Sequence, residues 1–159
     1  MKLDKAQELE KLEEFIFSID DLLEEITEKA MNQGYKLDLS MDSLGDFAKY
    51  IRNNGIENTK EHMIDFINCW VYLGEVFRLK VPDSEWTVGL ENPRKINYGL
   101  YFLTGFDENG SEFIPILYVN NFTKKVMDAT DEIFFSRLID GVVNPKPINL
   151  DYLPTEKIT

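Results

Sequence analysis

Apolar residues recur every three or four positions in the first part of the chain, which is the spacing of one helical face. The first such run extends from Leu3 to about Asn32 and ends before Gly34, a residue type favoured just beyond helix C-termini. Its apolar positions keep a heptad register, which favours either a long helix lying across a core or self-association through this seam. The seam consists of Leu9, Leu12, Ile16, Ile19, Leu23, Ile26 and Ala30.

A short second helix is predicted at 44–54, and Gly55 ends it. A third and more apolar helix is predicted between Asn58 and Val81. Asn58 and Glu61 have the spacing of a capping box. Apolar side chains cover most of the predicted circumference, and such a helix must be buried on several sides. We therefore expect it to be the core helix, with these side chains inward: Met63, Phe66, Trp70, Leu73 and Phe77.

Beyond Val81 the apolar period shortens to two, which is typical of strands. Three strands are predicted, at 86–90, 96–106 and 111–119. The sequence Asp-Glu-Asn-Gly at 107–110 predicts a hairpin turn between the last two, because Asn-Gly tolerates positive φ. Pro115 cannot donate to a sheet ladder, so the third strand should lie at an edge or be bulged.

A last helix is predicted from Asn120 or Asn121 to about Asp140, with Val126, Ala129, Ile133 and Phe134 inward. The expected fold class is α+β, with three N-terminal helices, a three-stranded antiparallel meander and a C-terminal helix. Residues 1–144 should form one domain, and 145–159 a proline-containing extended tail.

The net charge of the chain disfavours some classes of binding partner. The 159 residues carry a net charge of −12, which repels nucleic acid and anionic membranes and attracts basic proteins. A single cysteine excludes an intramolecular disulfide, and no stretch approaches the roughly 20 apolar residues that span a bilayer. The start of the chain lacks the apolar run of a signal peptide, so a cytoplasmic location is expected.

The largest single-sign surface is predicted on the first helix, because the chain from Met1 to Ala30 carries ten acidic residues and four lysines. We expect its acidic ridge to steer a basic partner, since charged rims act mainly on encounter rate. The alternative is a solvated face without a partner, the usual role of a charge run. The ridge consists of Asp21, Glu24, Glu25 and Glu28.

Few residues suggest chemistry, and no cofactor or metal is expected. His62, Asp65 and Cys69 share a helical face, but no second ligand cluster completes a zinc site. Glu75 follows Gly74, a mid-helix glycine whose expected use is close approach of another backbone.

Glu75 has two interpretations: a helical ion pair with Arg78, or a carboxylate in a groove between the core helix and the sheet. In the second, Tyr72 or Tyr101 would lie beside it. That arrangement would suit a small-molecule-binding protein or an enzyme using the carboxylate.

One pattern in the chain is similar to a known type of domain. It consists of the helix end YLGEVFR at 72–78, Trp86 opening a strand, and a hairpin reaching Phe-Ile-Pro-Ile at 113–116. This resembles small bacterial helix-plus-hairpin domains of unknown function, some of them immunity proteins of toxin systems. The resemblance implies a binding role and no catalytic residues. We therefore expect a non-enzymatic acidic binding protein, of the immunity type that neutralises a protein partner; the alternative is the Glu75 groove.

Overall fold

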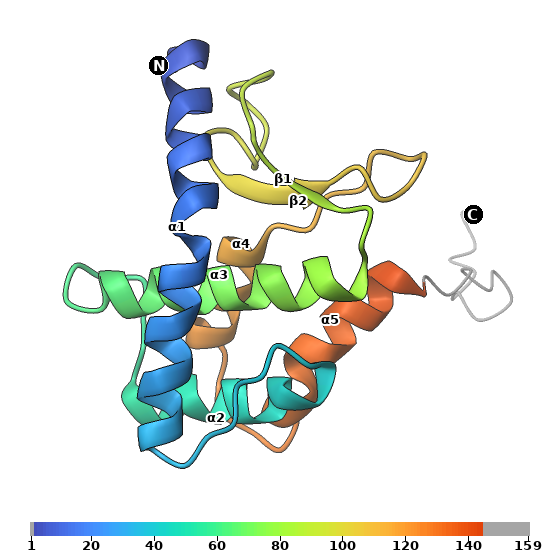
Figure 1. The fold of residues 1–159 in the computed structure, drawn as a ribbon. Helices are drawn as coiled ribbons and strands as arrows, with labels where there is room; N and C mark the ends of the chain where they lie inside the picture. The colour runs from blue at the N-terminus through green and yellow to red at the C-terminus, as the bar shows by residue number, and fades with distance from the viewer. Residues whose placement is uncertain (1, 145–159) are drawn as a thin grey trace, which may run out of the picture.

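Two helices that cross steeply, α1 (Lys5–Asn32) and α3 (Met63–Lys80), form the frame of the molecule (Figure 1). The structure is a computed structural model and describes residues 2–144. The sheet lies beside the N-terminal half of α1, whereas α2 and α5 lie on the other side of α3 (Figure 1). The remaining elements are α2 (Leu44–Asn54), β1 (Glu85–Val88), β2 (Tyr101–Thr104), α4 (Pro115–Lys124) and α5 (Phe134–Val143), with 3-10 turns at Met41–Ser43 and Asp131–Ile133.

The α3 helix is the core helix, as its composition predicted. Ten of its eleven residues from Phe66 to Val76 are buried, and Phe77 continues the run. The predicted start is wrong, because a turn in which the His62 amide donates to the Thr59 carbonyl occupies the place of the capping box. The helix begins at Met63, which is exposed rather than inward.

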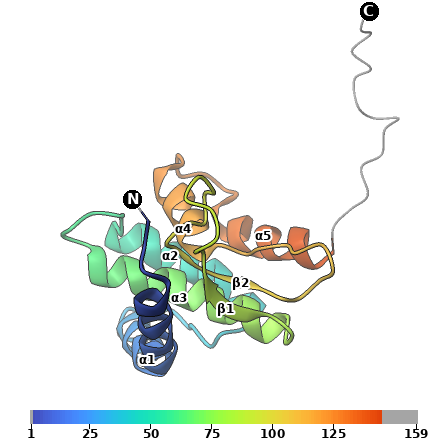
Figure 2. The same cartoon turned by 90° about the horizontal axis from the view of Figure 1, so that it is seen from above.

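The heptad seam of α1 is only partly used by the chain's own core. Its side chains Leu12, Ile19, Ile26 and Ala30 are buried. Leu9 and Ile16 remain 49% and 45% exposed. Figure 2 shows α1 at one side of the molecule with its outer flank uncovered by other elements. Asp4 caps the helix by accepting from the Gln7 amide, and Gly34 follows its end with φ of 85°.

The sheet has two strands among the described residues, so the predicted three-stranded meander is wrong. The β1 and β2 strands pair antiparallel, with Trp86 opposite Leu103. The third segment contributes a single bridge, Leu103 to Phe113, and then turns into α4. Pro115 is the first residue of that helix, where its fixed φ suits helix entry and its missing N–H costs nothing.

The predicted helix at 120–140 is two helices, α4 and α5, joined by a loop at 125–130. The cause is local: Asp128 accepts from the Thr130 amide at 2.8 Å, a side-chain bond that competes with helical backbone bonding. Val126, Ala129 and Ile133 are exposed as a result, against the prediction, and Phe134 is half-buried. The predicted tail at 145–159 lies outside the described residues.

Candidate interaction surface

The outer flank of α1 presents one continuous stripe of exposed side chains. Because an α-helix has 3.6 residues per turn, positions separated by four, seven, eleven and fourteen residues fall on one face. From Phe17 these positions all carry exposed residues. We call this set the outer stripe of α1: Phe17, Asp21, Glu24, Glu28 and Met31.

The two ends of the outer stripe are apolar, although nothing in the fold requires it. Phe17 is 94% exposed and Met31 is 69% exposed. A phenylalanine in mid-helix that touches so little contributes almost nothing to the core. The exposed neighbours of Phe17 one turn away are all acidic: Glu13, Glu14, Asp20 and Asp21. An aromatic side chain with a charged rim is the usual composition of a binding anchor.

The middle of the outer stripe contains three of the four predicted ridge residues. Asp21, Glu24 and Glu28 make no ion pair with any residue of the described 2–144 segment. Glu25 differs, because it is half-buried and pairs with Lys29 at 3.1 Å. The hydrogen bond from Lys29 to Asp65, at 2.9 Å, raises the pKa of the lysine further. The structure therefore leaves three ridge carboxylates unpaired on the surface of the described segment and pairs the fourth with Lys29.

A groove of about 630 Å³ opens at the C-terminal end of the outer stripe. Glu24 and Glu28, one helical turn apart, and Met31 are among the residues that line it. We call it the terminal groove; it is lined by Glu24, Thr27, Glu28, Met31, Gly34, Tyr35, Lys36 and Leu37. Glu24 and Glu28 belong to the predicted ridge, but the groove itself was not predicted from the sequence, because half of its lining comes from the segment after α1.

The Glu75 carboxylate is buried and already bonded at both oxygens. Arg78 donates to it from Nε at 2.8 Å and from Nη2 at 3.1 Å, and the Trp86 indole donates at 2.9 Å. The predicted ion pair with Arg78 is thus confirmed, and the bond to Glu75 raises the pKa of the arginine. Three donors satisfy most of the acceptor capacity of a carboxylate, so Glu75 mainly positions Trp86 and Arg78.

The two tyrosines considered beside Glu75 lie elsewhere. The Tyr72 hydroxyl is 2.6 Å from Ser43 Oγ, and burial raises its pKa to about 12. Tyr101 stacks on Phe15 with ring centroids 4.5 Å apart. A cavity of about 390 Å³ includes Glu75, but neither tyrosine lines it. The structure therefore does not bring the three residues into one groove.

The residues considered for zinc do not converge either. Cys69 is fully buried, and desolvation raises the pKa of its thiol well above the usual value. Asp65 pairs with Lys29, and His62 precedes the first turn of α3. Within residues 2–144 no group of three metal-binding side chains comes together.

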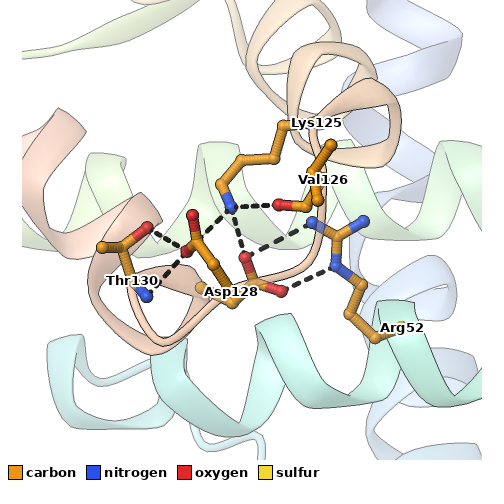
Figure 3. Close-up of polar contacts among 6 residues, drawn as sticks. Arg52, Lys125, Val126, Asp128 and Thr130 are labelled. Carbon is orange, nitrogen blue, oxygen red and sulfur yellow. Dashed lines mark hydrogen bonds and ion pairs between the residues drawn. The ribbon is translucent and has the colours of Figure 1, made fainter.

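An ion-pair cluster that was not predicted links α2 to the segment 125–131 (Figure 3). Arg52 Nε donates to Asp131 at 2.8 Å, and the guanidinium lies 4.1 Å from the centre of the Phe122 ring. Lys125 donates to the same carboxylate. The Arg52 bond lowers the pKa of Asp131 to about 2. Partners 79 residues apart leave no local signal in a sequence. The charges satisfy one another, which favours a structural role.

Comparison with protein-family models, with curated proteins and with solved structures finds no match to this chain. The likeness to immunity proteins of toxin systems therefore stays a prediction. None of the described helices has the length and apolar character that crossing a bilayer demands.

Proposed function

We propose that this chain is a non-enzymatic binding protein whose partner is a basic protein docking on the outer stripe of α1. The observation that carries the proposal is the order of side chains along the stripe. Two exposed apolar residues, Phe17 and Met31, flank carboxylates that have no partner in the described chain. Such a surface offers an anchor for a pocket together with charges that favour a positive surface.

The charge of the whole chain acts in the same direction. A net charge of −12 raises the association rate of a basic partner and disfavours acidic ones. Phe17 supplies what charge alone does not, namely apolar area that is removed from water on binding. We therefore expect the carboxylates to act mainly on the association rate with the partner, and Phe17 to act mainly on the lifetime of the complex.

Neutralisation of a toxin, as in immunity proteins, is the narrower form of this proposal. Its support is the sequence resemblance and the charge, since complementary charges steer the encounter of two proteins. A gene for a basic protein next to the gene of this chain would favour the narrower form. The alternative, a carboxylate-using site at Glu75, has less support because three donors already bond that side chain.

Affinity capture from the native host, compared among three baits, tests the proposal. The baits are the parent, Phe17→Ala, and Ile96→Ala, which removes another exposed apolar side chain that is not part of the outer stripe of α1. We expect a basic protein to be retained by the parent and by Ile96→Ala, and lost with Phe17→Ala or at about 1 M salt, where the Debye length falls to about 3 Å. Equal retention by all three baits, or retention of only acidic proteins, would overturn the proposal.

A further inference from the structure

We infer that Asn109 is a site of spontaneous covalent modification, at which the side-chain amide is lost and an aspartyl or isoaspartyl residue is formed. The observation that carries this inference is the contrast between the two Asn-Gly steps of the chain, Asn54–Gly55 and Asn109–Gly110. In such a step the peptide nitrogen of the glycine can attack the side-chain carbonyl carbon, because glycine has no side chain to hinder the approach. The inference is independent of the proposed function, since neither step belongs to the outer stripe of α1.

Asn109 lies in an exposed turn that follows β2. The Asp107 carboxylate shapes this turn by accepting from the Asn109 and Ser111 amides at 3.1 and 3.0 Å. The side-chain amide of Asn109 has no hydrogen-bond partner in the segment 2–144. Gly110 has φ of 70°, nothing lies within 4 Å of a Cβ built on it, and its amide donates to no backbone carbonyl of that segment. Neither reacting group is therefore held by another element of the fold.

Asn54 has the same neighbour in sequence and the opposite environment. Its Nδ2 donates to Gln33 Oε1 at 2.8 Å and to the Tyr50 carbonyl at 2.7 Å, and its Oδ1 accepts from Gln33 Nε2 at 2.9 Å. The Gly55 amide donates to the Arg52 carbonyl at 3.2 Å, where α2 ends. Ring closure at Asn54 must break these bonds, so it requires local opening of the helix end. The reaction there is slowed in proportion to the population of the open state.

The reaction needs only water as co-reactant. The Gly110 nitrogen loses its proton to solvent and forms a bond with Asn109 Cγ, while the bond from Cγ to Nδ2 breaks and ammonia leaves with a proton taken from solvent. Water then opens the cyclic imide at one of its two carbonyl carbons. Opening at Cγ gives aspartate, and opening at the backbone carbonyl carbon gives isoaspartate, in which the main chain runs through the side-chain carbon. Each product adds one negative charge next to Asp107 and Glu108.

Isoaspartate lengthens the main chain within a loop whose ends are fixed. Leu103 and Phe113 exchange two backbone hydrogen bonds at 2.8 and 2.9 Å, and Thr104 Oγ1 donates to the Ser111 carbonyl at 3.1 Å. These bonds lie outside the turn at 107–110, so β2 keeps its bridge when the turn is modified. We therefore expect the structural change to be confined to the turn.

Ageing of the purified full chain tests the inference. The protein is kept in mildly alkaline buffer made with ¹⁸O-labelled water, and the peptide covering each Asn-Gly step is analysed by mass spectrometry, with isoaspartate detected by an isoaspartyl methyltransferase. We expect ¹⁸O-labelled aspartyl and isoaspartyl forms to accumulate at Asn109 about tenfold faster than at Asn54, or more. Equal rates at the two sites in the folded protein, or an unmodified Asn109, would overturn the inference.

The unfolded chain and one variant make the test specific. In concentrated guanidinium chloride the two steps lose their different environments, so we expect their rates to converge to within about threefold. Asn109→Gln should stop the reaction at this position, because its longer side chain forms the larger ring less readily, and should leave the midpoint of urea unfolding unchanged. A rate difference that persists in the unfolded chain would contradict the protective role assigned to the hydrogen bonds of Asn54.

Discussion

The indole ring of Trp86 lies directly against Gly74, at a place where any other residue would have a side chain. A Cβ built on Gly74 would be 2.3 Å from Trp86 Cη2 and 3.2 Å from Pro115 Cγ. The glycine thus makes room for side chains of β1 and of the start of α4, whereas the sequence predicted close approach of another backbone. The next residue, Glu75, accepts the indole hydrogen bond at 2.9 Å and fixes the ring orientation.

The first prediction concerns this contact. Gly74→Ala gains about 1 kcal/mol of helix propensity, but it drives a methyl group into a buried ring, and overpacking typically costs about 1–3 kcal/mol. At a separation of 2.3 Å the upper end of that cost applies, so we expect a net loss of about 1–2 kcal/mol in the free energy of unfolding. Urea denaturation measures it. Gly141→Ala in α5 is the control, since nothing lies within 4 Å of its added Cβ, and should be neutral or stabilising.

The second prediction concerns Asn68, a buried residue of α3. Neither polar atom of its side chain has a hydrogen-bond partner among the described residues, and it is 1% exposed. Burying an unpaired amide costs about 1–3 kcal/mol. We expect Asn68→Leu, which is similar in size, to raise the free energy of unfolding by about 1 kcal/mol or more. A clear loss of stability in urea denaturation would mean that the amide is bonded in solution and would contradict this assignment.

The third prediction is a pH dependence at the Arg52–Asp131 pair. The folded pKa of Asp131, about 2, is below its unfolded value of 3.8. The pair therefore stabilises the fold above pH 3.8, and this contribution is lost as pH falls toward about 2. Asp131→Asn should be less stable than the parent at pH 7, and the difference should shrink between about pH 5 and pH 2. Chemical denaturation across this range measures it, with Glu57→Gln as the control that should show no such convergence.

The fourth prediction compares the buried Trp70 with the exposed Phe17. Trp70 is buried in a cluster with Phe15 and Trp86, at centroid distances of 5.5 and 6.2 Å. Trp70→Ala should cost about 3–5 kcal/mol, because it leaves a large cavity. Phe17→Ala should change stability by less than about 0.5 kcal/mol, as expected of an exposed side chain. Comparable losses for both variants in thermal or urea unfolding would contradict the exposed placement of Phe17.

The sequence predicted the helices whose apolar faces are long and regular. Periodicity identified α1, α2 and α3, and Gly55, which adopts φ of 57°, marked the end of α2. It failed after Leu103, where the apolar residues of 111–119 fit a strand and a helix equally well. Pro115 favours the helix because it is the first helical residue, where a proline is well tolerated. That position is known only once the helix start is known.

The candidate surface was predicted in part. The acidic ridge could be read from the composition of the first helix, and three of its four members do face outward. Phe17 was not singled out, because its exposure depends on which side of α1 the core covers. The terminal groove and the Arg52–Asp131 pair depend on contacts between distant segments, which no local pattern encodes.

The position of the small sheet has a consequence for aggregation. Unpaired strand edges are templates for pairing with other chains. Here β1 lies beside α1, and β2 is bridged by Phe113 just before the chain enters α4 (Figure 1). The bridge occupies part of the β2 edge, and each strand is only four residues long. A chain so rich in aromatic residues thus offers little open edge on which amyloid-like stacking could begin.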